Sequence, residues 1–101
     1  MPPNAVGFDA GCGSGRWSAC VAPRVGKIHC VDASPEALEV ARKNLSKQPN
    51  CEFHVASVSE LPLEDSSMDF GFSLGVLHHV PDTAGALKAC VSKLKPGAPF
   101  L

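Results

Sequence analysis

Asp9-Ala10-Gly11-Cys12-Gly13-Ser14-Gly15 is the stretch that decides the fold, because its three glycines join a short apolar run to a helical pattern. Glycine permits positive φ angles and lets a ligand approach the backbone closely. The N-terminus of the helix behind such a loop offers free N–H groups and a partial positive charge. The stretch therefore predicts a strand, a ligand-binding loop and a helix in succession.

The spacing of the glycines argues against two common nucleotide loops. A nucleoside triphosphate loop ends in Gly-Lys-[Ser/Thr], whereas Arg16 and Trp17 follow Gly15 here. The dinucleotide fingerprint G-x-G-x-x-G, counted from Gly11, requires a glycine where Arg16 stands. The observed spacing is G-x-G-x-G with an acid two residues ahead. A glycine-rich turn without a ligand remains the alternative for the loop taken alone.

Outward from the loop, strand-like and helix-like patterns alternate along the chain. We expect strands at 5–9, 27–31, 51–55 and 69–74, the start of a fifth at 98–101, and helices at 16–22, from 35 to about 45, and from 82 or 83 to 94. Parallel strands need such crossovers. The predicted fold class is α/β: a Rossmann-like, three-layer α/β/α domain with a mostly parallel sheet, about five strands present and later strands missing.

Apolar spacing predicts which helix faces are buried. Ser34 caps the second helix, Pro35 suits its first turn, and one face carries Leu38, Ala41 and Leu45. In the last helix we expect one face to hold Leu87, Cys90, Val91 and Leu94.

Asp32 ends the second predicted strand, 17 residues after Gly15. A carboxylate at that place can accept hydrogen bonds from the hydroxyls of a ribose. The alternative is that Asp32 caps the next helix, but Ser34 is better placed for that role.

Composition limits the class of protein. The 101 residues make one small domain, 1–101, and a net charge of -1 without a basic run predicts no nucleic-acid partner. No apolar run approaches the roughly 18 residues of a membrane span, and we see no signal peptide. The five scattered cysteines are odd in number and lack C-x-x-C spacing, which favours the cytoplasm. A chain that stops inside its last strand looks truncated, and its open sheet edge favours pairing with a second copy or another chain.

Five segments in order closely resemble the class I S-adenosylmethionine-dependent methyltransferases, particularly the small-molecule group related to ubiquinone and menaquinone biosynthesis. They are residues 9–15, Val31-Asp-Ala-Ser-Pro-Glu-Ala-Leu38, Leu61-Pro-Leu-Glu-Asp-Ser-Ser-Met-Asp69, Leu77-His-His-Val-Pro-Asp82 and Leu94-Lys-Pro-Gly97. The resemblance covers nearly the whole chain. It implies S-adenosyl-L-methionine as cofactor, a small-molecule acceptor and a methyltransferase domain core that is partial here.

The resemblance also implies roles for matching positions. Gly11, Gly13 and Gly15 hold the methionine part of the cofactor, and Asp9 lies near its ammonium end, directly or through water. Further positions take the ribose (Asp32), the adenine face (Ala33), the adenine edge (Ser57, Val58) and the methionine amino group (Leu74, Gly75). Many relatives carry Gly-Asp-Ala where this chain has Ala56-Ser57-Val58. Losing that charged acceptor weakens adenine binding by about 1 kcal/mol.

No catalytic residue is assigned, because methyl transfer mainly needs alignment of the acceptor with the activated methyl group. His78 and His79 are candidates for the acceptor side, with a structural role in their loop as the alternative. Adjacent histidines point in different directions and lack partners at metal-ligand spacing, so we expect no metal site. His29 and His54 are interpreted as packing or edge residues. Trp17 is interpreted as part of the core on the first helix, with contact to the cofactor loop as the alternative.

Three other functions remain open. The chain could be a non-catalytic or fragmentary cofactor-binding module that needs flanking regions or a partner. A nicotinamide-dependent oxidoreductase is disfavoured by the glycine spacing, and a polyamine synthase on the same fold lacks a signal of its own.

Overall fold

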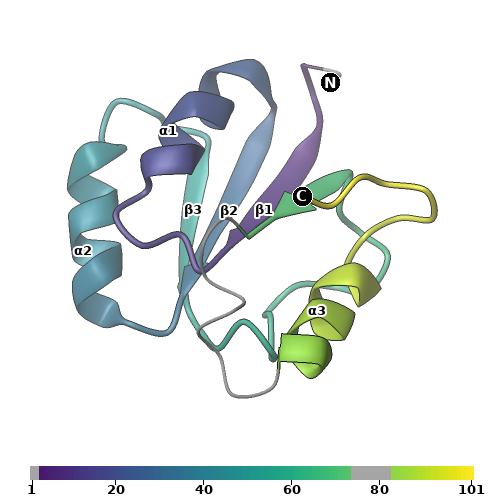
Figure 1. Ribbon diagram of the computed structural model, residues 1–101. Coiled ribbons are helices and arrows are strands. Elements are labelled where there is room, and N and C mark those ends of the chain that lie inside the picture. Colours follow the sequence, from purple (N-terminus) through teal and green to yellow (C-terminus); the bar gives the residue numbers. More distant parts are fainter. Residues whose placement is uncertain (1–2, 74–82) are drawn as a thin grey trace.

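A computed structural model of the protein describes residues 3–73 and 83–101 and contains one parallel four-stranded sheet (Figure 1). The strands are β1 (Val6–Ala10), β2 (Lys27–Asp32), β3 (Cys51–Val55) and β4 (Phe70–Phe72), in the spatial order β3-β2-β1-β4. The helical segments are α1 (Arg16–Val21), the short 3₁₀ turn η1 (Ala22–Arg24), α2 (Pro35–Asn44) and α3 (Thr83–Ser92). The predicted Rossmann-like α/β class is confirmed.

Helices cover both faces of the sheet, because alternate residues of each strand point to opposite sides. Ile28 and Cys30 of β2 belong to one apolar cluster with Leu38 and Leu45. Val31 belongs to a second cluster with residues of α3. Figure 1 shows α1 and α2 on one side of the sheet and α3 on the other. The structure therefore has the three layers that the alternation of patterns predicts.

The second helix begins and packs as the sequence predicts. The Ser34 Oγ accepts a hydrogen bond from the Ala37 N–H at 3.2 Å, and Pro35 occupies the first turn. Leu38, Ala41 and Leu45 are at most 2% exposed. This face fixes α2 against β2 and β3, and so fixes the direction in which the chain leaves Asp32.

Two Phe–Gly pairs hold the short strand β4 against β1. In the parallel register Gly7 lies opposite Phe70 and Phe8 lies opposite Gly71. A Cβ atom on Gly7 would lie 2.2 Å from the Phe70 ring, and one on Gly71 would lie 2.4 Å from the Phe8 ring. Each glycine thus leaves room for the phenyl ring of the opposite strand.

The expectation of about five strands is wrong for the described residues, which form four. Residues 98–101 approach β4 through a single parallel bridge between Gly71 and Phe100. The Ser73 N–H donates to the Leu101 carbonyl at 2.9 Å, and the Leu101 N–H donates to the Gly71 carbonyl at 3.0 Å. Only residues 99–101 run beside β4, and Pro99 has no N–H to donate, so the ladder is too short to be a strand.

The buried face of α3 also differs from the expectation. Ala86, Cys90 and Leu94 are buried, whereas Leu87 and Val91 are 42% and 50% exposed. The helix therefore packs on the i, i+4, i+8 row that begins at Ala86, since the small Ala86 side chain permits close approach to the sheet. Within residues 3–73 and 83–101, none of the helices has the length and apolar character needed to cross a bilayer.

Candidate functional site

The carboxyl ends of the parallel strands meet at one edge of the sheet, where ligands bind in open α/β sheets. The glycine loop, residues 11–15, follows β1 at this edge, and Asp32 is the last residue of β2. The loop is attached to the neighbouring strand, because the Gly11 and Cys12 N–H groups both donate to the Val31 carbonyl, at 2.7 and 2.9 Å. The Ser73 Oγ donates to the Ala10 carbonyl at 2.7 Å and connects β4 to the same edge.

Gly13 and Gly15 serve different purposes within the loop. Both have positive φ angles, +56° and +82°, which side chains rarely adopt. A Cβ atom on Gly15 would lie 2.8 Å from the Leu45 Cδ1, so this glycine lets α2 pack against the loop. A Cβ atom on Gly13 would meet nothing within 4 Å. The backbone at Gly13 is therefore accessible to a ligand.

The Asp32 carboxylate holds the loop and the start of α2 together. Its Oδ2 accepts a hydrogen bond from the Gly13 N–H, and its Oδ1 accepts one from the Ser34 N–H, both at 2.9 Å. Ser34, not Asp32, makes the helix cap, as predicted. A carboxylate oxygen has two lone pairs, so both oxygens keep the capacity to accept a further hydrogen bond. The contact with Gly13 was not foreseen from the sequence, because it joins residues on different strand–helix connections.

Asp9 lies beneath the loop and is 2% exposed. Its Oδ2 accepts a hydrogen bond from the Ser18 Oγ of α1 at 2.8 Å. The pKa of Asp9 is raised to about 7, mainly by burial; the hydrogen bond from Ser18 lowers the pKa, and the negative charge of Asp32 adds to the rise. The sequence did not indicate Ser18 as the partner of this carboxyl group.

The predicted adenine-side residues differ in accessibility. Ala33 and Ser57 are exposed, and the Ser57 Oγ lies 2.8 Å from the Ser59 Oγ. Val58 is only 7% exposed and packs in the cluster beneath α3. The side chain of Val58 therefore faces the core, which leaves its backbone as the part that could line a site. The Ala56 N–H donates to the Asp32 carbonyl at 3.0 Å, which brings this segment next to the end of β2.

Four predicted positions, Leu74, Gly75, His78 and His79, lie outside the described residues. Their roles stay predictions from the sequence. Cys12, inside the loop, is buried, and the neighbouring Cys30 thiol, burial and nearby carboxylates raise its pKa. A thiol in this state is a poor nucleophile.

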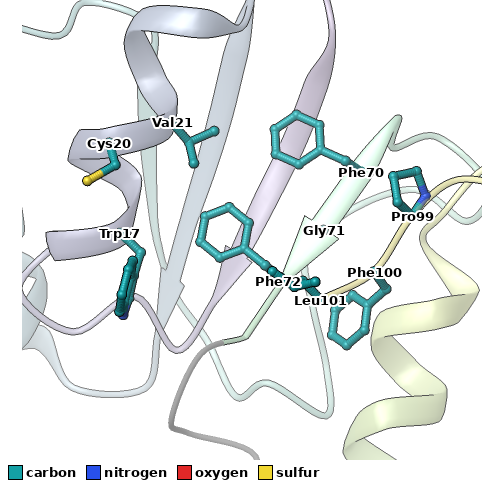
Figure 2. A pocket seen from close by; sticks show the side chains of 9 residues that line it. All are labelled: Trp17, Cys20, Val21, Phe70, Gly71, Phe72, Pro99, Phe100 and Leu101. Carbon is teal, nitrogen blue, oxygen red and sulfur yellow. The ribbon is translucent and has the colours of Figure 1, made fainter. Parts of the chain in front are cut away.

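Trp17 is not a core residue, contrary to expectation, since it is 43% exposed. It lines an apolar cavity of about 400 Å³ between α1, β4 and residues 99–101. Figure 2 shows Trp17, Cys20 and Val21 on the α1 side and Phe70 and Phe72 across from them. The Arg16 guanidinium lies 5.3 Å from the Trp17 ring centre, a cation–π distance that favours the exposed position.

A family model and several curated relatives match this chain. Residues 8–101 match the family model described as "Methyltransferase domain". The ubiquinone biosynthesis O-methyltransferase of Xanthomonas campestris pv. campestris (strain B100) is 36% identical over 97 residues, covering 94% of this chain and 41% of that protein. The chain thus spans about two fifths of the length of the curated relatives it matches.

Two solved structures share the fold. One comes from the complex between the Haloferax volcanii Trm112 methyltransferase activator and a protein named as a candidate methyltransferase, with 28% identity, a TM-score of 0.89 and coverage of 99% of this chain and 46% of that one. The other is a Methanococcus maripaludis protein named as a candidate S-adenosyl-L-methionine-dependent methyltransferase, with 26% identity, a TM-score of 0.84 and coverage of 91% and 44%.

Proposed function

Because this chain belongs to the methyltransferase domain family, we propose that residues 1–101 form the S-adenosyl-L-methionine-binding core of a methyltransferase that acts on a small molecule. One observation carries the proposal: a loop of three positive-φ glycines is held on the Asp32 carboxylate at the carboxyl edge of a parallel sheet. This edge is where such sheets bind nucleoside ligands.

The described residues fit the adenosine part of the cofactor. Both Asp32 oxygens accept from backbone N–H groups and keep free lone pairs, so they accept the two ribose hydroxyls as well. The exposed Ala33 packs on the adenine ring, while Ser57 and the Val58 backbone lie beside its edge. Ser57 offers one neutral acceptor, so recognition of the adenine amino group is weaker than with a carboxylate.

Charge distinguishes a cationic ligand from a pyrophosphate at this loop. Asp9 is buried beside the loop and Asp32 accepts a hydrogen bond from it, and the repulsion between the two carboxylates contributes to the raised pKa of Asp9. An ammonium or sulfonium group nearby relieves this repulsion and favours ionised Asp9, whereas a pyrophosphate increases it. Gly11, Gly13 and Gly15 then receive the methionine part, with Leu74 and Gly75 near its amino group.

The protein's contribution to the chemistry is alignment. The cofactor, when bound, supplies a methyl group activated by the neighbouring sulfonium. The sheet edge fixes the cofactor so that an acceptor can approach in line, and such positioning lowers the barrier without a fixed catalytic group. His78 and His79 are the candidates for contact with the acceptor. The Xanthomonas relative is an O-methyltransferase, which supports an acceptor that is a small molecule with a hydroxyl group.

The same proposal covers setting and partners. The five cysteines are all free, which suits a reducing cytoplasm. The net charge of -1 does not favour a nucleic-acid substrate. The edge strand β3 gives the sheet an open side through which a second copy or another chain could pair, whereas residues 99–101 run beside β4 on the other side.

A second candidate function is cofactor binding that supports turnover only with flanking regions or a partner protein. The Haloferax complex, in which a methyltransferase activator is paired with a candidate methyltransferase, favours this second function. Methyl transfer by the chain alone to a panel of hydroxylated aromatic acceptors would exclude it.

Calorimetric titration tests the cofactor site. We expect S-adenosyl-L-methionine and S-adenosylhomocysteine to bind, and NAD not to bind. Asp32→Asn keeps the shape of the side chain but removes its charge and one acceptor, so it should lower affinity at least about tenfold, the loss of a charge-assisted hydrogen bond. Asp65→Asn is the matched control, because Asp65 is an exposed carboxylate paired with Lys93 at 2.8 Å.

Thermal melting and circular dichroism of each variant confirm that it is folded. Binding of NAD in preference to the adenosyl ligands would favour an oxidoreductase. Absence of adenosyl binding to the folded chain, or equal affinity in Asp32→Asn and Asp65→Asn, would overturn the proposed site.

A further inference from the structure

His29, Glu52 and His54 form a cluster of potential metal ligands on β2 and β3, separate from the glycine loop. One ligand atom from each residue lies within 4.8 Å of the others. The His29 Nδ1 is 3.0 Å from the His54 Nε2 and 3.9 Å from the Glu52 Oε2. The two imidazole ring centres are 5.2 Å apart. The three side chains therefore bring three potential ligand atoms within reach of a single metal ion.

The strand register explains why they meet. His29 lies opposite Glu52 in the parallel pairing of β2 and β3, and Val31 lies opposite His54. Residues two apart on a strand share a face, so His29, Glu52 and His54 all lie on the face opposite α2. The connection 56–69, which follows β3 on this face, is described throughout and contains no helix. Figure 1 shows α3 beside the β1 and β4 side of the sheet, away from β3.

We propose that His29, Glu52 and His54 bind a divalent transition-metal ion of the Zn²⁺ class through two imidazole nitrogens and one carboxylate oxygen. Two histidines with one glutamate are a known ligand set for Zn²⁺, and three protein ligands leave one position for water. This inference departs from the expectation of no metal site, which rested on the spacing of residues along the sequence. The ligands here come from two strands, and only the register brings them together.

The distances suit one ion with small movements. Ligand atoms around a tetrahedral Zn²⁺ are roughly 3.4 Å apart, given bonds of about 2.1 Å. The separations of 3.0 and 3.9 Å lie on either side of that value, and all three ligand atoms lie within 4.8 Å of one another. The Glu52 side chain is 51% exposed and free to rotate inward, while that of His29 is 12% exposed and held by its neighbours. The His29 Nδ1 and the His54 Nε2 are 3.0 Å apart, so one of them carries the hydrogen of the bond between them; when both nitrogens bind an ion, this hydrogen moves to the other nitrogen of the same neutral ring.

Lys27 allows a second test, in which a substitution should raise the affinity for the metal instead of lowering it. Its Nζ lies 3.3 Å from the Glu52 Oε2, so in the absence of metal an ammonium group neutralises this carboxylate. A bound dication and this ammonium repel each other, and the Lys27 side chain is 48% exposed and able to swing away. Removing the lysine charge should therefore strengthen metal binding. If cations were only attracted to the surface non-specifically, removing any lysine charge would raise the affinity for the metal. Lys47→Gln is therefore the control for Lys27→Gln.

The experiment is calorimetric titration of the metal-free chain with Zn²⁺, supported by absorption spectra with Co²⁺. We expect one ion per chain, an affinity at least tenfold lower in His54→Gln and in Glu52→Gln, and a higher affinity in Lys27→Gln but not in Lys47→Gln. The double variant His78→Gln/His79→Gln is the matched control, because it removes the other two of the four histidines. It should keep the affinity of the original chain.

Co²⁺ separates this site from the five thiols, since thiolate ligands add an intense near-ultraviolet band that imidazole and carboxylate ligands do not give. A thiolate band, unchanged affinity in both His54→Gln and Glu52→Gln, or loss of binding in the His78/His79 double variant would overturn the proposal. Glu52 is exposed, so Glu52→Gln stays informative even if His54→Gln fails to fold. Titration with S-adenosyl-L-methionine, run separately, reports on the cofactor site alone.

Discussion

Replacing Gly15 with alanine should destabilise the fold far more than the same change at Gly13, although both glycines lie in one loop with positive φ angles of +82° and +56°. An alanine in the left-handed region costs about 1–2 kcal/mol at either position. At Gly13 nothing else is added, because its Cβ would meet no atom within 4 Å. Gly13→Ala should therefore lower the free energy of unfolding by about 1–2 kcal/mol.

At Gly15 a second term arises from packing. The new Cβ would lie 2.8 Å from the Leu45 Cδ1 and 3.2 Å from its Cγ, and Leu45 is 2% exposed within the cluster beneath α2. Because the leucine has no free space to move into, overpacking adds about 1–3 kcal/mol. Gly15→Ala should thus cost about 2–5 kcal/mol, a large part of the roughly 5–15 kcal/mol that stabilises a domain.

Urea unfolding followed by circular dichroism measures these differences at constant m-value. A double-mutant cycle isolates the packing term: Leu45→Ala alone costs about 2–5 kcal/mol, but in the Gly15→Ala background it also relieves the clash. The double variant should be more stable than the sum of the single effects by about 1–3 kcal/mol. Equal destabilisation by Gly13→Ala and Gly15→Ala, or strict additivity with Leu45→Ala, would refute this division of roles.

Three further predictions follow from burial and charge. The pKa of the Asp9 carboxyl is raised from 3.8 to about 7, so its protonated form favours the folded state. The free energy of unfolding should therefore fall by up to about 4 kcal/mol as the pH rises from about 4 to 7. Urea unfolding at a series of pH values measures this slope, and Asp9→Asn should flatten it. An unchanged slope would show that burial does not control this group. Cys20 is exposed, whereas Cys12 is buried and its pKa is raised. Mass spectrometry after brief alkylation should therefore find Cys20 modified at least about tenfold faster than Cys12. Equal labelling would mean that the glycine loop opens readily. Leu87→Ala should change the unfolding free energy by less than about 0.5 kcal/mol and Leu94→Ala by about 2–5 kcal/mol. An equally large cost at both positions would restore the helix face expected from the sequence.

Local signals explain why most elements could be predicted. The strand 51–55 agrees with β3 to the residue, and Ser34-Pro35 marks the start of α2. These features depend on a few neighbouring residues: a β-rich run bounded by breakers, and a capping side chain before a proline. The sequence signal for the glycine loop is equally local, since three glycines within five residues mark where the backbone can adopt positive φ angles.

Features that depend on tertiary contacts could not be read in the same way. The buried row of α3 begins at Ala86, because the small side chain allows close approach, whereas apolar periodicity favoured Leu87. The hydrogen bond between Ser18 and Asp9 joins a helix to the strand before it. The meeting of His29 with His54, which are 25 residues apart in the chain, depends on the register of β2 and β3. A pattern along one element does not contain this information.

Asp32 combines an observed structural role, in which its carboxylate holds the loop, with the proposed role of accepting hydrogen bonds from the ribose. The sequence posed a choice between a helix cap and a ribose acceptor, yet the carboxylate fixes the Gly13 and Ser34 N–H groups and retains lone pairs for a ligand. Since the same two oxygens shape the loop before any ligand arrives, the ordering of Gly13 is already achieved in the free protein, and binding need not supply it. Alanine at this position removes loop support and ligand acceptor together, so its effect on affinity has two causes. Asparagine leaves one oxygen to accept from either N–H, so it too affects both roles, and the loss of unfolding free energy in each variant, measured beside its loss of affinity, shows how much of the effect comes from loop support.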